Sequence, residues 1–253
     1  MLQRSSAIVV VALTLLACAC GSKKQAKVTV PPPPPIKEAQ TQASAAAPHS
    51  TTPPKTANAE RDEDENHSGP KPLFVETGLA SWYGGPYNKR KASNGEVYDM
   101  HAMTAAHRTL PLESIVRVTN VKTGHSVVVR ITDRGPFVAG RILDLSQAAA
   151  KKIDVWGAGV AMVRIEVLKA PASLTNGGRW AVQIGAFEKE HAAGKLADNL
   201  SRRYQTAKVL CFSSPIGDWW VRVRVQNDDR KRAEEVAHNT RTAEGDIFLV
   251  RLD

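Results

Sequence analysis

The chain has 253 residues, which fits one or two domains of roughly 100–200 residues each. Its three cysteines are too few for a disulfide scaffold, and none of them forms a C-x-x-C metal-binding pair. The 34 Lys and Arg residues exceed the 25 Asp and Glu residues and give a net charge of +9, which suits nucleic acid, anionic lipid or an acidic polymer as partner. We expect no metal and no cofactor.

The N-terminus reads as an export signal. Arg4 precedes an apolar run from Ala7 to Ala17, the pattern of a secretory signal and too short to span a bilayer. Leu15-Leu16-Ala17-Cys18 resembles the lipobox of bacterial lipoproteins, which implies a signal at 1–17 and a lipid on Cys18. Cys20 is the alternative attachment site, and an ordinary cleaved signal is the alternative to both. Export argues against a nucleic-acid partner. By resemblance to known sorting, the lack of Asp after either cysteine favours the periplasmic face of the outer membrane.

Residues 18–72 are expected to form a disordered tether. They contain the proline run Pro31–Pro35 and an Ala/Ser/Thr/Pro segment, a composition that buries too little apolar surface to offset chain entropy. A second break of small residues at 171–177 predicts a linker. The sequence therefore predicts two domains, 73–170 and 178–253.

The first domain reads as several short strands. Alternating or β-branched segments predict strands at 79–83, 115–121, 125–132 and 162–168. One helix is expected at 146–153, with Ser146 as its N-cap. Strands of this length within 100 residues predict a small β-barrel.

This domain resembles the rare lipoprotein A family. The motifs that carry the resemblance are Gly78-Leu79-Ala80-Ser81-Trp82-Tyr83-Gly84, Ser93-Asn94-Gly95-Glu96, Thr104-Ala105-Ala106-His107-Arg108, Asp133-Arg134-Gly135-Pro136-Phe137 and Gly140-Arg141-Ile142-Leu143-Asp144-Leu145-Ser146. The resemblance implies a double-psi β-barrel and lytic transglycosylase activity on peptidoglycan, with Asp133, Glu96 and His107 as catalytic residues. Ser93 departs from the family, which often has Ala there.

The implied chemistry suits these residues. A carboxyl group protonates the leaving oxygen, and the C6 hydroxyl of muramic acid attacks C1 to give a 1,6-anhydro end without water. Asp133 is expected to be this acid, with Glu96 raising its pKa or stabilising the positive ring, and His107 orienting a carboxyl group. Each residue also has a non-catalytic alternative: Asp133 as a turn residue, Glu96 as a solvated acid in a turn, and His107 as a structural histidine. Asp144 and His125 are expected to be structural.

The second domain reads as β-α-β-β-α-β, the ferredoxin-like order. Strands are expected at 180–187, 209–212, 219–225 and 247–252, and helices at 190–204 and 228–240. Val182–Phe187 and Trp220–Val223 resemble the SPOR family, which implies binding of glycan that lacks stem peptides. On the third strand, Trp220 and Arg222 share the face opposite Val221, and Gln183 lies on the neighbouring strand; these three are the expected glycan-binding residues. Cys211 is expected to be buried.

The partners we expect are therefore peptidoglycan, in the form of denuded glycan strands, and a membrane through the lipid anchor. The SPOR resemblance implies enrichment at the division site, with division-site proteins as further partners. Two other functions stay open. One is a non-catalytic, expansin-like protein that binds or loosens glycan. The other is a hydrolase, if Glu96 and Asp133 lie roughly 6.5–9.5 Å apart with room for water.

Overall fold

The computed structural model describes residues 71–253. The predicted signal, both candidate lipid-attachment cysteines and nearly all of the predicted tether lie outside these residues. Two sheets make up the described part: a closed barrel, followed by a four-stranded sheet carrying two helices.

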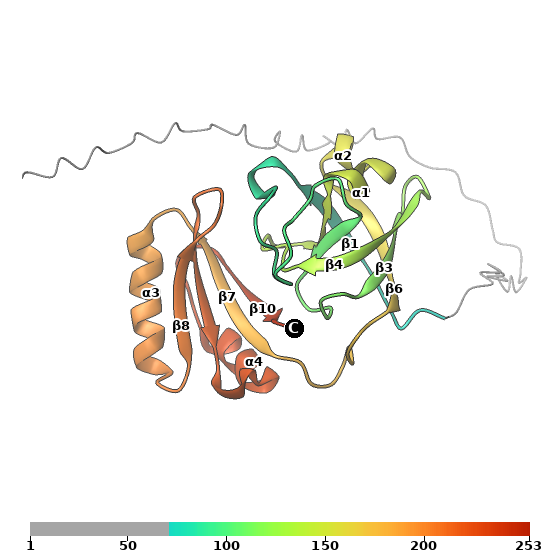
Figure 1. The fold of residues 1–253 in the computed structure, drawn as a ribbon. Helices are drawn as coiled ribbons and strands as arrows, with labels where there is room; N and C mark the ends of the chain where they lie inside the picture. The colour runs from blue at the N-terminus through green and yellow to red at the C-terminus, as the bar shows by residue number, and fades with distance from the viewer. Residues whose placement is uncertain (1–70) are drawn as a thin grey trace, which may run out of the picture. The chain divides into compact units, whose positions relative to one another are not determined.

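The barrel has six strands (Figure 1). They are β1 Phe74–Tyr83, β2 Thr104–His107, β3 Ile115–Asn120, β4 Ser126–Asp133, β5 Arg141–Ser146 and β6 Ala161–Lys169. The strand order around the barrel is β1-β5-β2-β4-β3-β6. The β1–β5 and β2–β4 pairs are parallel and the others are antiparallel. This is the small β-barrel that the strand pattern predicted, in the double-psi form that the family resemblance implied.

Alternation along each strand fills the barrel with aliphatic side chains. Val116 and Val118 of β3 and Val163, Ile165 and Val167 of β6 are fully or almost fully buried. Burying such a side chain contributes roughly 1.5–3 kcal/mol relative to leaving it in water. The residues between them face outward, away from this core. A functional site on the barrel can therefore be built from polar side chains on its outer face.

Two short helices, α1 Gln147–Lys152 and α2 Val155–Ala158, lie together at one end of the barrel (Figure 1). The Ser146 hydroxyl accepts the backbone N–H of Ala149 at 3.2 Å, which confirms Ser146 as the N-cap of α1. The structure adds α2, which the sequence did not predict. Two 3₁₀ turns, η1 Gly85–Tyr87 and η2 Gln226–Asp228, complete the helical segments.

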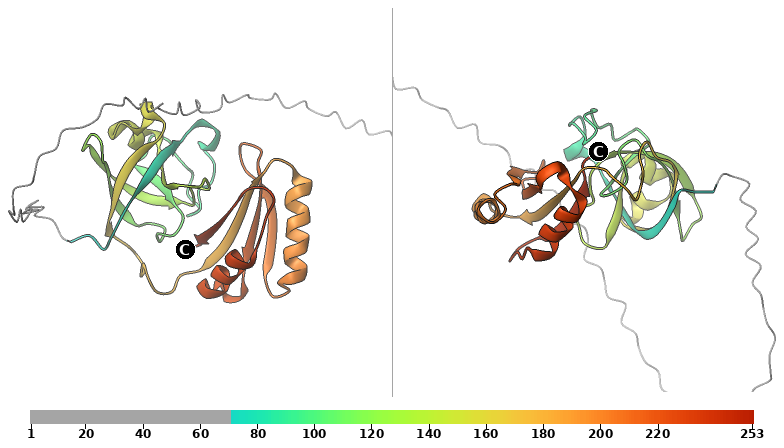
Figure 2. Two further views of the ribbon diagram at one scale, coloured as in Figure 1. Left: turned by 180° about the vertical axis from the view of Figure 1, so that it is seen from behind. Right: turned by 90° about the horizontal axis from the view of Figure 1, so that it is seen from below.

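The second sheet consists of β7 Trp180–Phe187, β8 Lys208–Ser213, β9 Trp219–Arg224 and β10 Asp246–Arg251, in the order β10-β7-β9-β8. Helices α3 Glu190–Arg203 and α4 Arg230–Asn239 pack on one face of it, and Figure 2 shows α3 running along the sheet. Val221 and Val223 face these helices in a common core with Leu200 and Val236. The ferredoxin-like prediction is confirmed.

Three barrel strands and one cysteine differ from the expectations, and the first is β1, which begins at Phe74 rather than at Leu79. The sequence did not predict β2 or β5, because each is short and each is held by partners distant in the chain. Cys211 is exposed, so the prediction that it is buried is wrong; it lies on β8, at the edge of the sheet. Over residues 71–253, the helices are all too short or too polar to cross a membrane.

Candidate functional site

Asp133 ends β4 beneath the long loop that joins β1 to β2. Its Oδ1 atom accepts the backbone N–H of Ser93 at 3.0 Å, the Ser93 hydroxyl at 2.5 Å and the N–H of Arg134 at 2.8 Å. Hydrogen bonds to a carboxylate are roughly twice as strong as those between neutral groups. The three donors fix the orientation of the carboxyl group. The Ser93 hydroxyl, present where the family often has Ala, is therefore part of the site.

The turn that follows Asp133 is anchored by a buried guanidinium group. Arg134 is 8% exposed, and its Nη1 atom donates to the carbonyl oxygens of His107 at 3.0 Å and Leu110 at 2.8 Å. Burial lowers the pKa of Arg134 to about 10, so the group stays charged at neutral pH. Arg134 therefore fixes the end of β4 against the turn after β2.

Glu96 belongs to the same loop and forms a two-pronged ion pair. Arg130 donates from Nη1 to Oε1 at 3.0 Å and from Nη2 to Oε2 at 2.7 Å, and it also donates to Glu113 at 2.6 Å. The Arg130 guanidinium lowers the pKa of Glu96 and holds the carboxyl group ionised. The side-chain carbonyl of Asn94 accepts the Glu96 N–H at 3.0 Å, which is the local turn that the Asn-Gly-Glu sequence predicted.

The loop brings Asp133 and Glu96 to one edge of the barrel. Ser93 bonds to Asp133, and the next residue, Asn94, donates its backbone N–H to the carbonyl of Thr132 at 3.1 Å. Glu96 follows two positions later. The sequence did not predict Arg130 as a member of this group. Its outward position on β4, next to buried Ile131, was the only signal in the sequence.

His107 lies on the other side of β2. It follows Ala106, the residue that pairs with Asp133, and successive residues of a strand face opposite sides. It is 4% exposed, and its Nδ1 atom accepts the backbone N–H groups of Thr109 and Leu110 at 3.1 and 3.0 Å. Its Nε2 atom faces Glu76 at 3.4 Å. Burial lowers the pKa of the ring, so His107 is neutral and orders the turn after β2.

A row of polar side chains crosses the outer face of the barrel beside Asp133. Asp144 on β5 pairs in register with Ala106, and Ala106 pairs with Asp133 on its other side. Tyr83 on β1 and Thr104 on β2 alternate onto the same face. Burial raises the pKa of Asp144 to about 6, although Arg141 and Arg108 act against it. The sequence predicted a structural role for Asp144, because the burial of its side chain depends on tertiary structure and cannot be seen in the local pattern.

The three residues expected to bind glycan lie on the face of the second sheet away from its helices. Arg222 donates from Nε to the Gln183 side-chain oxygen at 3.0 Å, with a second bond from Nη2, and its guanidinium lies 5.2 Å from the Phe212 ring centre. Trp220 packs against Gly185, where an added Cβ would come within 2.7 Å of the indole. Trp220 is 7% exposed and Gln183 is 2% exposed.

Arg224, on the same face as Arg222, is engaged elsewhere. Its Nε and Nη2 atoms donate to the two carboxyl oxygens of Asp228 at 3.0 and 2.6 Å. The aromatic cluster on this face also contains Phe248 and the aliphatic Val250, which the sequence did not single out. The arrangement offers one guanidinium group beside aromatic rings, which suits a carboxylate-bearing sugar.

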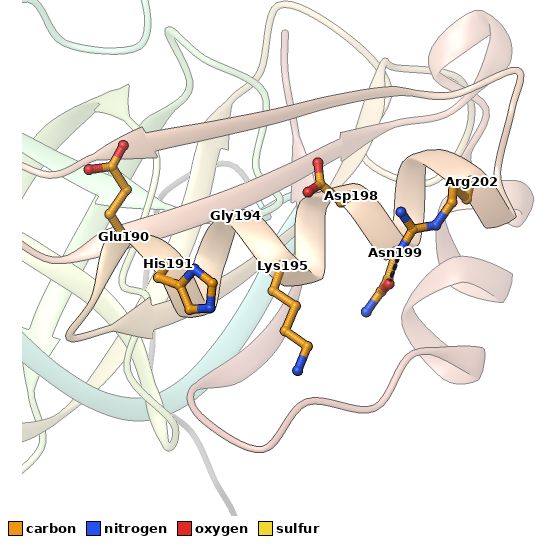
Figure 3. A pocket seen from close by; sticks show the side chains of 7 residues that line it. All are labelled: Glu190, His191, Gly194, Lys195, Asp198, Asn199 and Arg202. Atoms are coloured by element: carbon orange, nitrogen blue, oxygen red, sulfur yellow. Dashed lines mark hydrogen bonds between the residues drawn. The ribbon is translucent and has the colours of Figure 1, made fainter.

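A shallow hollow on the outer side of α3 is a third candidate. It is lined by Glu190, His191, Gly194, Lys195, Asp198, Asn199 and Arg202 (Figure 3). The charged side chains project from one solvated helix face, and none of these residues belongs to the two groups above. In residues 71–253, no set of three or more His, Cys, Asp or Glu side chains is placed to hold a metal ion.

Comparison with known proteins matches both parts of the chain. Residues 75–165 match the lytic transglycolase family and residues 176–247 match the SPOR domain. The chain belongs to the rare lipoprotein A family. It is 48% identical over 136 residues to the Vibrio cholerae "Endolytic peptidoglycan transglycosylase RlpA", a match that covers 51% of this chain and 52% of that protein. A protein with the same description from Neisseria meningitidis is 50% identical over 122 residues, covering 47% and 51%.

The chain spans about half the length of the curated relatives that it matches. A solved structure of a Clavibacter michiganensis expansin variant in complex with cellohexaose is also similar, with a TM-score of 0.33 and 15% identity. It covers 60% of this chain and 81% of that one.

Proposed function

We propose that this protein is a lytic transglycosylase that cleaves peptidoglycan glycan strands to 1,6-anhydro-muramic acid ends. The observation that carries the proposal is the carboxyl group of Asp133, which Ser93 and Arg134 hold in one orientation on the family's barrel. The Vibrio cholerae and Neisseria meningitidis relatives are endolytic peptidoglycan transglycosylases by description, which supports the same reaction.

In the proposed reaction, the bond between C1 of muramic acid and the leaving oxygen breaks as that oxygen gains a proton. The C6 hydroxyl attacks C1 and gives up its own proton, so no water is consumed. We assign these transfers to Asp133, whose hydrogen bonds engage only Oδ1 among the described residues and leave Oδ2 to face substrate.

Glu96 and His107 have supporting roles in this proposal. The ionised Glu96 carboxylate stabilises the positive charge that builds on the sugar ring, and Arg130 holds it in place. His107 acts from behind β2: by binding the N–H groups of Thr109 and Leu110, it fixes the turn to which Arg134 is anchored. It thereby positions Asp133.

The second sheet brings the enzyme to its substrate. The guanidinium group of Arg222, oriented by Gln183, binds the lactyl carboxylate of muramic acid, and Trp220 offers an aromatic edge to the sugar. Stem peptides would crowd this flat strand face, so denuded strands are the preferred ligand.

We further propose lipid attachment at Cys18, with Cys20 as the alternative, at the periplasmic face of the outer membrane. Residues 18–72 serve as the tether, and the SPOR domain enriches the protein at the division site. A fluorescent fusion tests this. It is expected to follow the constricting envelope, to stay there after Cys20→Ala and to leave the membrane after Cys18→Ala. A uniform fusion during constriction would contradict division-site recruitment.

The reaction is tested by digesting purified glycan, with and without stem peptides, using the purified chain and its Asp133→Asn variant. Anhydro-muramic ends from the parent, absent from the variant, are the expected result. Products heavier by one water would indicate a hydrolase. Glycan binding without new ends would indicate an expansin-like binding protein, and the catalytic assignments would then fall.

A further inference from the structure

The outer face of the barrel places a second acidic side chain beside Asp133. Ala106 on β2 pairs with Asp133 of β4 on one side and with Asp144 of β5 on the other. The register shifts between the Ala105–Ile131 and Ala106–Asp133 pairs, so that Asp133 turns to the outer face with Ala106, and paired residues project their side chains to the same face of a sheet. Neighbouring strands lie about 4.8 Å apart, which puts the two aspartate Cα atoms roughly 10 Å apart. The Ala106 side chain between them is small and buried.

Asp144 has one carboxyl oxygen that no neighbour satisfies. Among the described residues, its Oδ1 is buried without a hydrogen-bond partner, while its Oδ2 lies 3.4 Å from Nη2 of Arg141. The side chain as a whole is 15% exposed. A buried polar atom without a partner is costly and calls for an explanation such as catalysis.

Other unsatisfied groups surround the same spot. The Tyr83 hydroxyl on β1, the Thr104 hydroxyl on β2 and Nε of Arg141 are also buried without partners in the described part of the chain. The Tyr83 and Thr104 hydroxyls lie near each other without a hydrogen bond of normal geometry. After burial itself, the charges of Asp133, Tyr98 and Asp144 raise the pKa of Tyr83, as expected for a hydroxyl on the same face as both acids.

These groups converge from four adjacent strands, β1, β5, β2 and β4. One face of the barrel thus carries two carboxyl groups and two hydroxyls. Cleavage of a glycosidic bond needs such groups, because the sugar oxygens must be bound and the leaving oxygen protonated. Enzymes that use separate acid and base carboxyls to cleave glycosides keep them roughly 6.5–9.5 Å apart, a span that side chains on alternate strands can reach.

We propose that Asp144 is a second catalytic residue of this site, the general acid that protonates the leaving oxygen, and that Asp133 takes the proton of the C6 hydroxyl. The inference rests on the proposed transglycosylase function and divides between two groups the transfers assigned above to Asp133. The C1–O bond to the leaving sugar breaks as the Asp144 proton moves to that oxygen. The C6 oxygen forms the new bond to C1, and its proton passes to Asp133.

Each turnover leaves Asp144 ionised and Asp133 protonated. The proton returns through solvent, so atoms and charge balance without a co-reactant. This division of roles explains the contrast between the two carboxyl groups: Asp133 accepts three hydrogen bonds on one oxygen, whereas Asp144 is buried with few partners. Burial raises the pKa of Tyr83, so its hydroxyl stays protonated.

The test compares two substrates that differ in the need for an acid. One is natural glycan. The other is a muramyl-terminated glycan carrying 4-nitrophenolate as the leaving group, which departs without a proton. General acid catalysis contributes roughly 10²–10⁴-fold in rate. The Asp144→Asn variant of the full chain is expected to lose at least about 100-fold on natural glycan and less than about tenfold on the aryl glycoside.

Asp133→Asn removes the base and is expected to be inactive on both substrates. Asp154→Asn is the matched control: this aspartate is exposed in the α1–α2 turn and pairs with His125 at 2.6 Å. It is expected to match the parent on both substrates. Asp144→Glu keeps an acid and is expected to recover part of the natural-glycan activity that Asp144→Asn loses.

Two results for Asp144→Asn would overturn the inference and leave the proposed function standing. One is cleavage of natural glycan at the rate of the parent. The other is an equal loss of activity on both substrates in a variant that still binds glycan. A failure of Asp144→Asn to fold would move the decision to Asp144→Glu, and equal losses on both substrates there would overturn it too. A parent chain that yields no anhydro ends would remove the proposed function and this inference together.

Discussion

Replacement of Asp144 by Asn is expected to stabilise the barrel at neutral pH. The folded protein raises the pKa of this carboxyl group from 3.8 to about 6, because burial disfavours the charged form more than Arg141 and Arg108 favour it. Between these two values the folded state binds more protons than the unfolded chain. The free energy of unfolding therefore falls as pH rises through this window.

The size of the effect follows from the shift. A pKa change of one unit corresponds to 1.36 kcal/mol, so a rise from 3.8 to about 6 corresponds to roughly 3 kcal/mol of destabilisation above pH 7. Asn is similar in shape and carries no charge, so it escapes this cost. Near pH 4 the folded state holds the carboxyl group protonated and the unfolded chain, with a pKa of 3.8, is roughly half protonated, so the advantage of Asn shrinks to about 0.5 kcal/mol.

The assay is denaturant unfolding of the full chain and of Asp144→Asn at pH 7.5 and at pH 4.0, with Asp154→Asn as control. The variant is expected to gain on the order of 2–3 kcal/mol at pH 7.5 and only about 0.5 kcal/mol at pH 4.0. A gain of equal size at both pH values would refute the reasoning, since it would not arise from ionisation. A loss at pH 7.5 would show that the ion pair with Arg141 outweighs the burial of the charge.

Three further outcomes are expected at the two sites. Ser93→Ala removes one donor to Asp133 and is expected to lower kcat roughly tenfold with little change in KM, whereas Ser93→Thr keeps the hydroxyl and most of the activity. An unchanged kcat in Ser93→Ala would show that the hydroxyl is dispensable. Arg130→Gln frees Glu96, whose pKa then rises toward its ordinary value; the acid limb of the pH–rate profile is expected to move to higher pH, and an unmoved limb would argue against a role for the Glu96 carboxylate. Arg222→Ala is expected to weaken glycan binding in a sedimentation assay, with Arg222→Lys between it and the parent; the loss of a partner for a buried amide also costs the second domain roughly 1–3 kcal/mol, read by thermal unfolding. Arg222→Ala that binds glycan as the parent does would place the binding face elsewhere.

The local pattern of the chain predicted most of its elements. Alternation placed β3, β4 and β6 within two residues of their observed limits, and it placed β7 at Trp180–Phe187 without error. The small residues of β2, Thr104–His107, carry no such pattern, and β5 mixes Arg141 and Asp144 with aliphatic residues. Both strands exist because the barrel closes around them, which is a non-local effect.

The sequence also separated the two faces of β9 correctly. Val221 and Val223 pack on the helices, and Trp220 and Arg222 lie on the other face, because a side-chain period of two depends only on local backbone geometry. Which side chains pair across strands was not predictable in the same way. Arg222 reaches Gln183 over a separation of 39 residues, and Arg130 reaches Glu96 over 34.

The sequence by itself therefore determined the family and the barrel and ferredoxin-like folds. Its family motifs also marked the positions of two acids, Asp133 and Glu96, and of one histidine, His107. Only the tertiary structure decided how those groups are charged and oriented. Glu96 is held ionised by Arg130, His107 turns away from Asp133, and Asp144 is buried beside unsatisfied hydroxyls. The physical reason is that pKa and hydrogen bonding depend on burial and on neighbours brought together from distant strands, whereas strand and helix patterns arise from adjacent residues.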